Sequence, residues 1–351
     1  MPREEDSETF EWPAGSGAQG GASHEAPRRF EPAELVACDA CLRANAPTRM
    51  NCLYCGAPLP ADGRGAAMRR PALRKLEEWE RGFNVVLHPP ASEPAPETLE
   101  EVAALLRLEA SRLAEIVAAG LALPVARAST GEEAALIVSR LGALGLASEV
   151  FADEELARTP PRVRALKLEV GALAFVHGAE GEPARAAWED LALMVTGRVV
   201  ERRVEFEERP GKLGVGGARL VEARETAVDE AVLDIYTADE GAAGFRIMAD
   251  GFDYSCLGEA KALLARENFV RLVGALRARA TRAAFDDAYT RLRAPLSAVW
   301  PPAERTESGG LRRDRPGRLN TESVTVVSNE SQFTRYARLR RRLALRERAK
   351  D

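Results

Sequence analysis

The stretch ACDACLRANAPTRMNCLYCGAPLP, residues 37–60, contains four of the five cysteines of the chain. They form two Cys-x-x-Cys pairs, Cys38 with Cys41 and Cys52 with Cys55, and ten residues separate the pairs. Two such pairs on tight turns supply the tetrahedral set of four sulfurs that zinc favours. The sequence therefore predicts one structural Zn²⁺ with a closed shell of four thiolates.

The residues around these cysteines support a metal. Residues 35–60 contain too few large apolar side chains to fold alone, and a structural zinc contributes roughly 10–16 kcal/mol to such a module. Two disulfides or a redox Cys-x-x-Cys are the alternatives. A redox motif normally occurs singly, beside a βαβ pattern. Two copies in a short module favour the metal.

This segment resembles the short zinc-ribbon modules found at the ends of many bacterial proteins. The resemblance covers residues 35–60 and implies metal binding. It implies no particular function, because such ribbons bind proteins or nucleic acids, or have no known partner.

The segments on either side of the cysteine module are polar and rich in small residues. Residues 1–34 are rich in Gly, Ser and acids and predict a disordered tail, and 61–72 predict a flexible linker. Residues 73–152 alternate between extended and helical periods and predict a small domain in the order β-α-α-β-α-β, preceded by a charged helix over 73–83. Its best-specified helix begins at a T-x-x-E capping box, Thr130 with Glu133.

Residues 83–152 resemble the C-terminal domain of the bacterial ribosomal stalk protein in this element order. In that family, basic residues near the helical hairpin contact translation factors. The matching stretch here, LRLEASRLAEIVAAG, has Arg107 and Arg112 and no lysine. We therefore expect a re-used fold rather than translation-factor binding.

Residues 160–300 predict a larger α+β domain, with strands first and helices over 261–279 and 283–292. This region resembles a pleckstrin-homology-like domain, which implies a run of strands closed by a helix. Its candidate lipid loop, HGAEGEPAR, is not basic, so a protein-binding or structural version is expected. Residues 301–320 predict a polar loop. The overall prediction is an α+β multi-domain protein of bacterial type.

The C-terminal segment 321–351 predicts a strongly basic helix. Arginines at helical spacing form one face that could contact phosphates, nucleic acid or an acidic partner: Arg335, Arg338, Arg342 and Arg346. Apolar residues at 333, 336, 339 and 343 could pack onto the protein or onto a partner. The alternative is a capping helix with a solvated arginine face.

Catalytic motifs are scarce. The three histidines are scattered, and no H-E-x-x-H or G-x-S-x-G occurs. The glycine-rich stretch 211–217 has no G-K-[ST] and predicts a loop. Cys256 is expected on a strand, as a buried apolar residue rather than a nucleophile. No catalytic residue and no small-molecule substrate is predicted.

Composition limits the classes that remain. The chain has 351 residues, 46% hydrophobic and 29% charged, with a net charge of −5. No apolar run is long enough for a membrane span, and the acidic N-terminus is unlike a signal peptide, so a cytoplasmic protein is expected. The first hypothesis is a non-enzymatic zinc-binding interaction or adaptor protein with a protein partner. Alternatives are a nucleic-acid-associated protein using the ribbon and the arginine-rich helix, or an enzyme with its site in 160–300.

Overall fold

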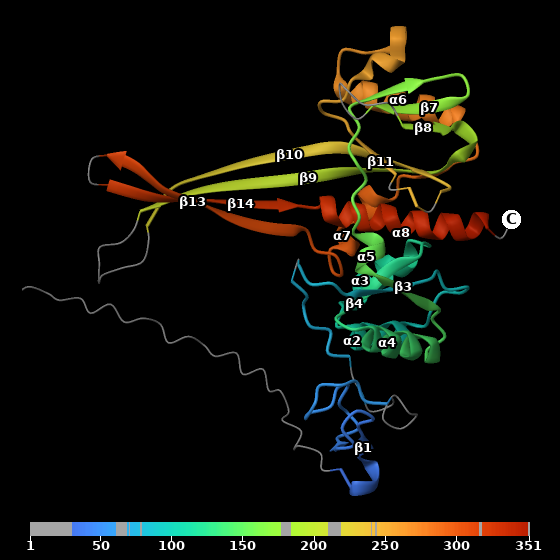
Figure 1. Ribbon diagram of the computed structural model, residues 1–351, viewed down its shortest axis with the longest axis vertical. Helices are drawn as coiled ribbons and strands as arrows, with labels where there is room; N and C mark the ends of the chain where they lie inside the picture. Colours follow the sequence, from blue (N-terminus) through green and yellow to red (C-terminus); the bar gives the residue numbers. More distant parts are fainter. Residues whose placement is uncertain are drawn as a thin grey trace, which may run out of the picture. The chain divides into compact units, whose positions relative to one another are not determined.

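The computed structural model describes residues 30–60, 69, 71–77, 79–176, 184–209, 219–239, 241–242, 244–315 and 318–349. The chain divides into two compact units, Met1–Arg69 and Arg70–Asp351 (Figure 1). Most of the tail expected over 1–34 and of the linker expected over 61–72 lies outside the described residues, as does the glycine-rich stretch 211–217. The last residues of the expected tail form a 3-10 turn, η1 (Pro32–Glu34).

The first unit is built around its cysteines. Two short antiparallel strands, β1 (Val36–Ala37) and β2 (Ala44–Asn45), flank the first cysteine pair. The buried apolar side chains of this unit are Cys38, Cys52 and Leu59. Arg69 is buried and donates hydrogen bonds to the carbonyl oxygens of Pro47, Leu59 and Pro60. Such a small apolar cluster contributes little stability, so we expect the cysteines and their contacts to hold this unit together.

The second unit begins with the predicted β-α-α-β-α-β order. Its elements are β3 (Phe83–Leu87), α2 (Pro96–Leu106), α3 (Ala110–Ala118), β4 (Leu123–Ala128), α4 (Gly131–Ala143) and β5 (Ser148–Ala152). The three strands form an antiparallel sheet with β3 in the centre, and the fully buried side chains of Val85, Val86 and Phe151 anchor its core. The α4 cap is as predicted, because Thr130 Oγ1 accepts a hydrogen bond from the Glu133 amide at 3.2 Å.

The helix expected over 73–83 is not formed. Residues 71–77 adopt neither helix nor strand, and β3 already begins at Phe83. The amide of Leu73 donates to Glu133 Oε1 at 2.7 Å, and Leu73 has φ 41°. This long-range hydrogen bond holds the segment in a conformation that a helix does not allow.

A second sheet, with a separate three-stranded meander, forms most of the remaining unit. The meander consists of β6 (Ala165–Leu168), β7 (Ala172–Val176) and β8 (Ala184–Ala187). The larger sheet has the order β11-β10-β9-β14-β13, with β12 (Ala284–Asp286) parallel to β9. Its strands are β9 (Leu191–Arg209), β10 (Arg219–Thr237), β11 (Phe245–Met248), β13 (Ala303–Arg315) and β14 (Arg318–Ser328).

The base of this larger sheet is buried on both faces. On one face, Met194, Leu233 and Ile247 belong to a core shared with the meander and with α6 (Ala265–Arg279). On the other face, Leu193 and Val232 belong to a second core shared with α7 (Tyr289–Leu296) and α8 (Glu330–Arg348). Successive residues of β9 are apolar because they point to opposite faces of the sheet and both faces are buried.

An ion pair is buried on the face that α8 covers. Arg246 on β11 donates two hydrogen bonds of 2.8 Å to the carboxylate of Asp234 on β10, and both side chains have no exposed surface. The Tyr236 hydroxyl donates to the same carboxylate at 3.0 Å, and Glu330 of α8 accepts from Arg246 at 3.0 Å. The ion pair therefore joins two strands of the sheet to the helix that covers them.

The remaining helical segments are short: α5 (Asp153–Leu156), η2 (Trp188–Asp190) and η3 (Tyr254–Ala260). Two sequence predictions in this region are wrong in detail. The helix expected over 283–292 is β12 followed by α7, and Cys256 lies in η3 rather than on a strand. The Cys256 side chain is half-buried, and burial raises the pKa of its thiol.

The polar loop expected over 301–320 is also wrong. Most of that stretch is β13, which pairs antiparallel with β14, and β14 pairs with β9. The predicted C-terminal helix, 321–351, is correspondingly shorter, because β14 continues to Ser328 and α8 begins at Glu330. On the side that faces β14, the backbone groups of β13 are satisfied by strand pairing.

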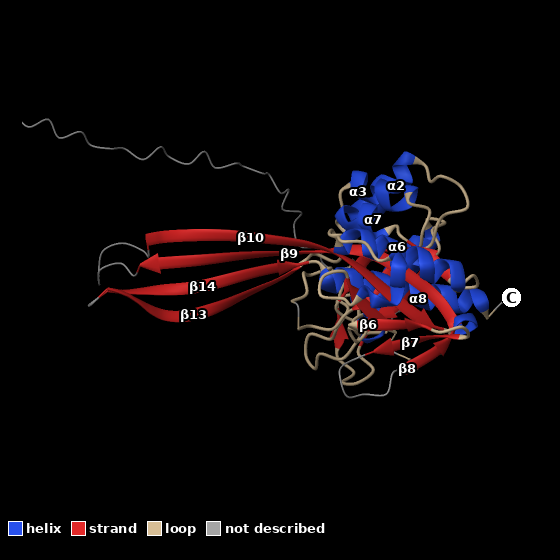
Figure 2. Cartoon of the chain, turned by 90° about the horizontal axis from the view of Figure 1, so that it is seen from above, coloured by secondary structure: helices blue, strands red, loops and turns tan. Residues whose placement is uncertain are grey.

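Together β9, β10, β13 and β14 extend beyond the base of the sheet as a four-stranded arm, which Figure 2 shows running away from the helices. We use "arm" for residues 201–209, 219–230, 303–315 and 318–328. No helix covers the arm among the described residues.

Candidate metal centre

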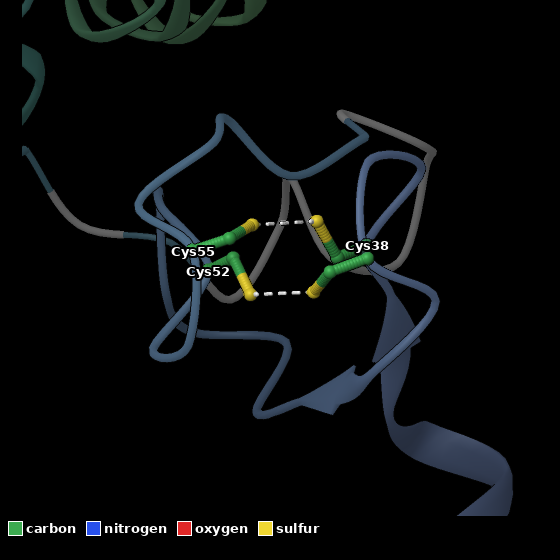
Figure 3. A group of neighbouring side chains, drawn as sticks. Cys38, Cys52 and Cys55 are labelled. Atoms are coloured by element: carbon green, nitrogen blue, oxygen red, sulfur yellow. Dashed lines mark hydrogen bonds between the residues drawn. The ribbon is translucent and has the colours of Figure 1, made fainter.

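The four cysteines of the first unit come together at one point. Sγ of Cys38 lies 3.6 Å from Sγ of Cys55, and Sγ of Cys41 lies 3.5 Å from Sγ of Cys52. All four sulfurs lie within 4.8 Å of one another. Figure 3 shows the sulfurs of Cys38, Cys52 and Cys55 directed toward a common centre. The four cysteines are thus positioned to bind a metal ion.

These separations distinguish a metal site from disulfides. A tetrahedron of sulfurs around zinc, with bonds of about 2.3 Å, has edges of about 3.8 Å. A disulfide requires a sulfur–sulfur distance of about 2.05 Å, and all four cysteines are free thiols. The distances of 3.6 and 3.5 Å both join cysteines of different pairs, as expected when both pairs face one ion.

Each cysteine pair forms the same backbone turn. The amide of Cys38 donates to the Arg43 carbonyl at 3.0 Å, and the amide of Cys52 donates to the Ala57 carbonyl at 2.8 Å. In each turn the residue four places after the first cysteine donates back to that cysteine's carbonyl: Leu42 in one, Gly56 in the other. Both residues are left-handed, with φ 59° and 76°.

Leu42 is a feature that the sequence did not indicate. Glycine adopts a left-handed conformation without a steric cost, as Gly56 does in the second turn, whereas a leucine there is strained. The Leu42 side chain is 82% exposed, so packing does not compensate for the strain. The first turn is therefore held by the contacts around the cysteines.

Asn45 was also missed, although it supports the site directly. It is buried, its Nδ2 lies 3.4 Å from Cys52 Sγ, and its Oδ1 accepts from the Leu53 amide at 2.8 Å. The Asn45 side chain thereby links the two cysteine turns. Nothing in the spacing of the cysteines points to an asparagine seven residues before Cys52.

Hydrogen bonds to sulfur prepare one thiol for ionisation. Burial opposes ionisation of Cys52, but the amides of Cys55 and Tyr54 and the Asn45 side chain lower its pKa to about 6. For Cys41, the Arg43 amide lowers the pKa, but burial and the neighbouring cysteines raise it to about 12. In the metal-free chain Cys52 therefore ionises more readily than Cys41.

Large apolar side chains beside the site are left exposed. Leu42 is 82%, Leu53 63% and Tyr54 54% exposed, and the Arg43 guanidinium lies over the Tyr54 ring at 4.7 Å. None of these residues belongs to the small core of this unit. These exposed side chains are available for contact with another molecule.

The arginine row predicted on the C-terminal helix is bound within the second unit. Arg335 is 14% exposed and lies 3.9 Å from Asp153, and Arg338 donates to the Glu155 carbonyl at 3.4 Å. Arg342 pairs with the Glu155 carboxylate at 2.7 Å, and Arg346 pairs with Glu149. The arginine row therefore contacts β5 and α5, while the side chains of Arg342 and Arg346 remain 37% and 53% exposed.

The rest of α8 is equally engaged. Phe333, Tyr336 and Leu339 have no exposed surface and belong to the second core. On its other side, Arg340 pairs with Asp286 at 2.6 Å, and Arg341 donates to the Ala242 carbonyl at 2.7 Å. Within the described residues, α8 therefore packs between the larger sheet and the small α/β part of the unit, and contacts both.

No histidine site is assembled in the described part of the chain. His88 lies 3.0 Å from Glu149, which also binds Arg346, so it belongs to the same surface ion-pair group. His24 and His177 lie outside the described residues. Apart from the four cysteines, the described residues contain no group of three or more potential ligands within metal-binding distance.

Comparisons with known proteins add no family. The sequence matches no family model, and searches of curated proteins and of solved structures found no significant match. Among the helices that the structure describes, none combines the length and apolar content needed to cross a membrane. The function has to be inferred from the geometry of the chain.

Proposed function

We propose that this chain is a non-enzymatic interaction protein, in which zinc holds the first unit together and the arm of the second unit binds a protein partner. The observation that carries the proposal is the exposure of both faces of the arm. The four cysteine ligands favour zinc, because a closed set of four thiolates is typical of structural zinc.

The same two strands are buried at their base and exposed in the arm. In β9, the five residues 191–195 are all buried, whereas neighbouring residues such as Arg202 and Arg203 are both exposed although they point to opposite faces. In β10, residues 223–229 are all exposed. A sheet with two open faces adds little to the stability of its own chain.

The arm presents apolar and charged side chains together. Register places Val204 and Phe206 on one face and Val324 and Val326 on the other. Val228 is 51% exposed. The outer strand β13 leaves one edge unpaired in the described residues, with acids and an arginine along it at 304, 305 and 307. Surfaces that mix β-branched, aromatic and charged residues in this way are suited to a protein partner.

The charge of the arm argues against nucleic acid. The arm contains twelve acids and ten arginines. It therefore has no excess of positive charge with which to bind phosphates. The arginines predicted for nucleic-acid contact, Arg335, Arg338, Arg342 and Arg346, are held by contacts to β5 and α5.

The test shortens the arm at a rung that crosses all four strands. Arg203 pairs with Thr226 and with Val326, and Val326 pairs with Arg305. Residues 204–225 and 306–325 are each replaced by Asn-Gly, which forms a two-residue hairpin turn. The thermal midpoint of the second unit should change little, because no core residue is removed.

Full-length and shortened chains are then crosslinked in their native cells, and the captured proteins are quantified. The proposal expects a specific set of proteins that is lost with the arm and insensitive to nuclease. Leu53→Ser serves as a control for contacts of the first unit. Equal capture by both chains, or capture abolished by nuclease, would contradict the proposal.

A further inference from the structure

A cavity of about 370 Å³ lies beside the small α/β sheet of the second unit. Four separate segments line it: residues 73–76, the end of α2 with residues 107–108, β4 at 125–127, and residues 297–301 after α7. Volumes of this order are typical of small-molecule sites, which often lie where separate parts of a fold meet.

The cavity combines an apolar floor with a cationic rim. Leu106, Val125 and Val299 are buried and contribute to the floor. The other lining residues include four cationic side chains: Arg74, Lys75, Arg107 and Arg127. No acidic side chain is among the lining residues. This combination matches a molecule with an apolar body and an anionic group.

Two of the four cations already have carboxylate partners. Arg74 pairs with Glu80 at 2.6 Å, and Arg127 pairs with Asp153 at 2.5 Å. The side chains of Lys75 and Arg107 make no hydrogen bond or ion pair with the residues that the structure describes. Fixed partners position Arg74 and Arg127, and the side chains of Lys75 and Arg107 offer further hydrogen-bond donors to an anion.

Unusual backbone conformations place two of the lining residues. Leu73, Arg107 and the turn residue Leu42 are the non-glycine residues with positive φ in the described chain. Leu73 and Arg107 both line this cavity, with φ 41° and 55°. Arg107 ends α2 with its amide directed to the Ala103 carbonyl, a position that glycine fills at lower cost. Such strain is concentrated at functional sites.

We propose that this cavity binds a small amphipathic organic anion. Its apolar body lies against the floor of Leu106, Val125 and Val299, and its carboxylate or phosphate group binds Lys75 and Arg107. The site is independent of the metal centre and of the arm, so its test does not depend on the function proposed above.

The first experiment titrates the full-length chain by calorimetry with four probes: octanoate, octyl phosphate, octanol and acetate. Octanoate or octyl phosphate should bind with a Kd on the order of 0.1–1 mM, and their relative affinity distinguishes a carboxylate ligand from a phosphate ligand. Octanol and acetate should each bind at least tenfold more weakly, because each lacks one of the two features.

The second experiment uses Arg107→Gly, which removes the charge while giving the left-handed position its preferred residue. Its thermal midpoint should be equal to or above that of the wild type. Its affinity for the better anionic probe should fall about tenfold, which is the effect of one charge-assisted hydrogen bond. Lys75→Gln should have a similar effect on affinity.

Arg112→Gln is the matched control, because Arg112 lies on the neighbouring helix α3, pairs with Glu115 and does not line the cavity. It should bind the probe as the wild type does. The proposal is overturned if neither anionic probe binds, or if octanol or acetate binds as well as the anionic probe. It is equally overturned if Arg107→Gly is stable and retains wild-type affinity.

Discussion

The two units of this chain solve the same problem of buried charge with different counter-ions. In the first unit, four cysteine sulfurs lie within 4.8 Å of one another and their thiolates need a cation from outside the chain. In the second unit, the buried carboxylate of Asp234 is neutralised by Arg246 of the same chain. We therefore expect the first unit to depend on a bound metal, whereas Asp234 of the second unit has its counter-ion in the same chain.

The apolar cores differ in the same direction. The first unit buries Cys38, Cys52 and Leu59, with three partly buried side chains packed against them. The second unit has two larger cores, one on each face of the sheet base. Stability from burial grows with the apolar area that is buried. Removal of the metal should therefore unfold the first unit, whereas loss of the Asp234–Arg246 pair should only lower the stability of the second unit.

Loss of the metal should produce the largest effect. The purified chain is expected to hold one zinc, and Cys52→Ser or chelation should release it and unfold residues 35–60. The free energy at stake is roughly 10–16 kcal/mol. Mass spectrometry under native conditions measures the zinc content. Amide hydrogen exchange of the full chain measures the unfolding of residues 35–60.

The comparison also predicts what chelation leaves intact. Amides of β9, β10 and α8 should keep their protection, because their cores contain none of the four cysteines. Full retention of zinc by Cys52→Ser would contradict the four-thiolate site. Cooperative unfolding of the second unit on chelation would contradict the independence of the two units.

Breaking the internal ion pair should have the next largest effect. Asp234→Asn leaves Arg246 buried with a weaker partner and should lower the unfolding free energy of the second unit by about 3–5 kcal/mol. Denaturant unfolding of the zinc-loaded chain, followed by near-ultraviolet circular dichroism, measures it.

A double variant sharpens this result. Asp234→Leu with Arg246→Met replaces the pair by apolar groups and should cost less than Asp234→Asn alone. A double variant that is less stable than the single one would show that Arg246 acts mainly through its other partners, such as Glu330.

Acid should weaken the second unit through Asp153. Burial alone would raise the pKa of this carboxyl, but Arg127 and Asn84 hold it below its usual value. A carboxyl with a lowered folded pKa stabilises fully above its unfolded pKa of about 3.9, and this contribution is lost as pH falls through the folded pKa. Unfolding free energies measured from pH 7 to pH 3 should therefore decline less steeply in Asp153→Asn, which should be about 1.5–3 kcal/mol less stable at pH 7.

The difference between base and arm explains which parts of the fold could be predicted. The α/β order over 83–152 was predicted because amphipathic helices and buried strands leave periodic patterns. The strand β13 was missed because, in the arm, neither face is buried and no alternation marks it; residues 303–310 are small or polar and end in two glycines. The β-branched run 324–327 in β14 was the available signal.

The candidate site shows the same limit. The cysteine ligands were found because four thiolates within eighteen residues form a local pattern. The arginine row was found as a charge pattern, but its partners Asp153, Glu155 and Glu149 lie nearly 200 residues away in sequence. Spacing along the chain carries no information on such pairs, so the partners of the row were not predicted.

The smallest expected effect compares the two cysteine turns with each other. Leu42 and Gly56 occupy equivalent left-handed positions, but only the glycine does so without strain. Leu42→Gly should therefore stabilise the first unit by up to about 1 kcal/mol. Because this unit folds with its metal, the gain should appear as zinc affinity about threefold to fivefold higher in competition with a chelator.

Gly56→Ala is the reverse change at the equivalent position. No atom lies within 4 Å of an added Cβ there, so the substitution introduces backbone strain and no collision. It should lower zinc affinity by a similar factor. If both variants bind zinc like the wild type, the left-handed turns do not limit stability, and the hydrogen bonds of Asn45 and the thiolate–metal bonds account for the fold of this unit.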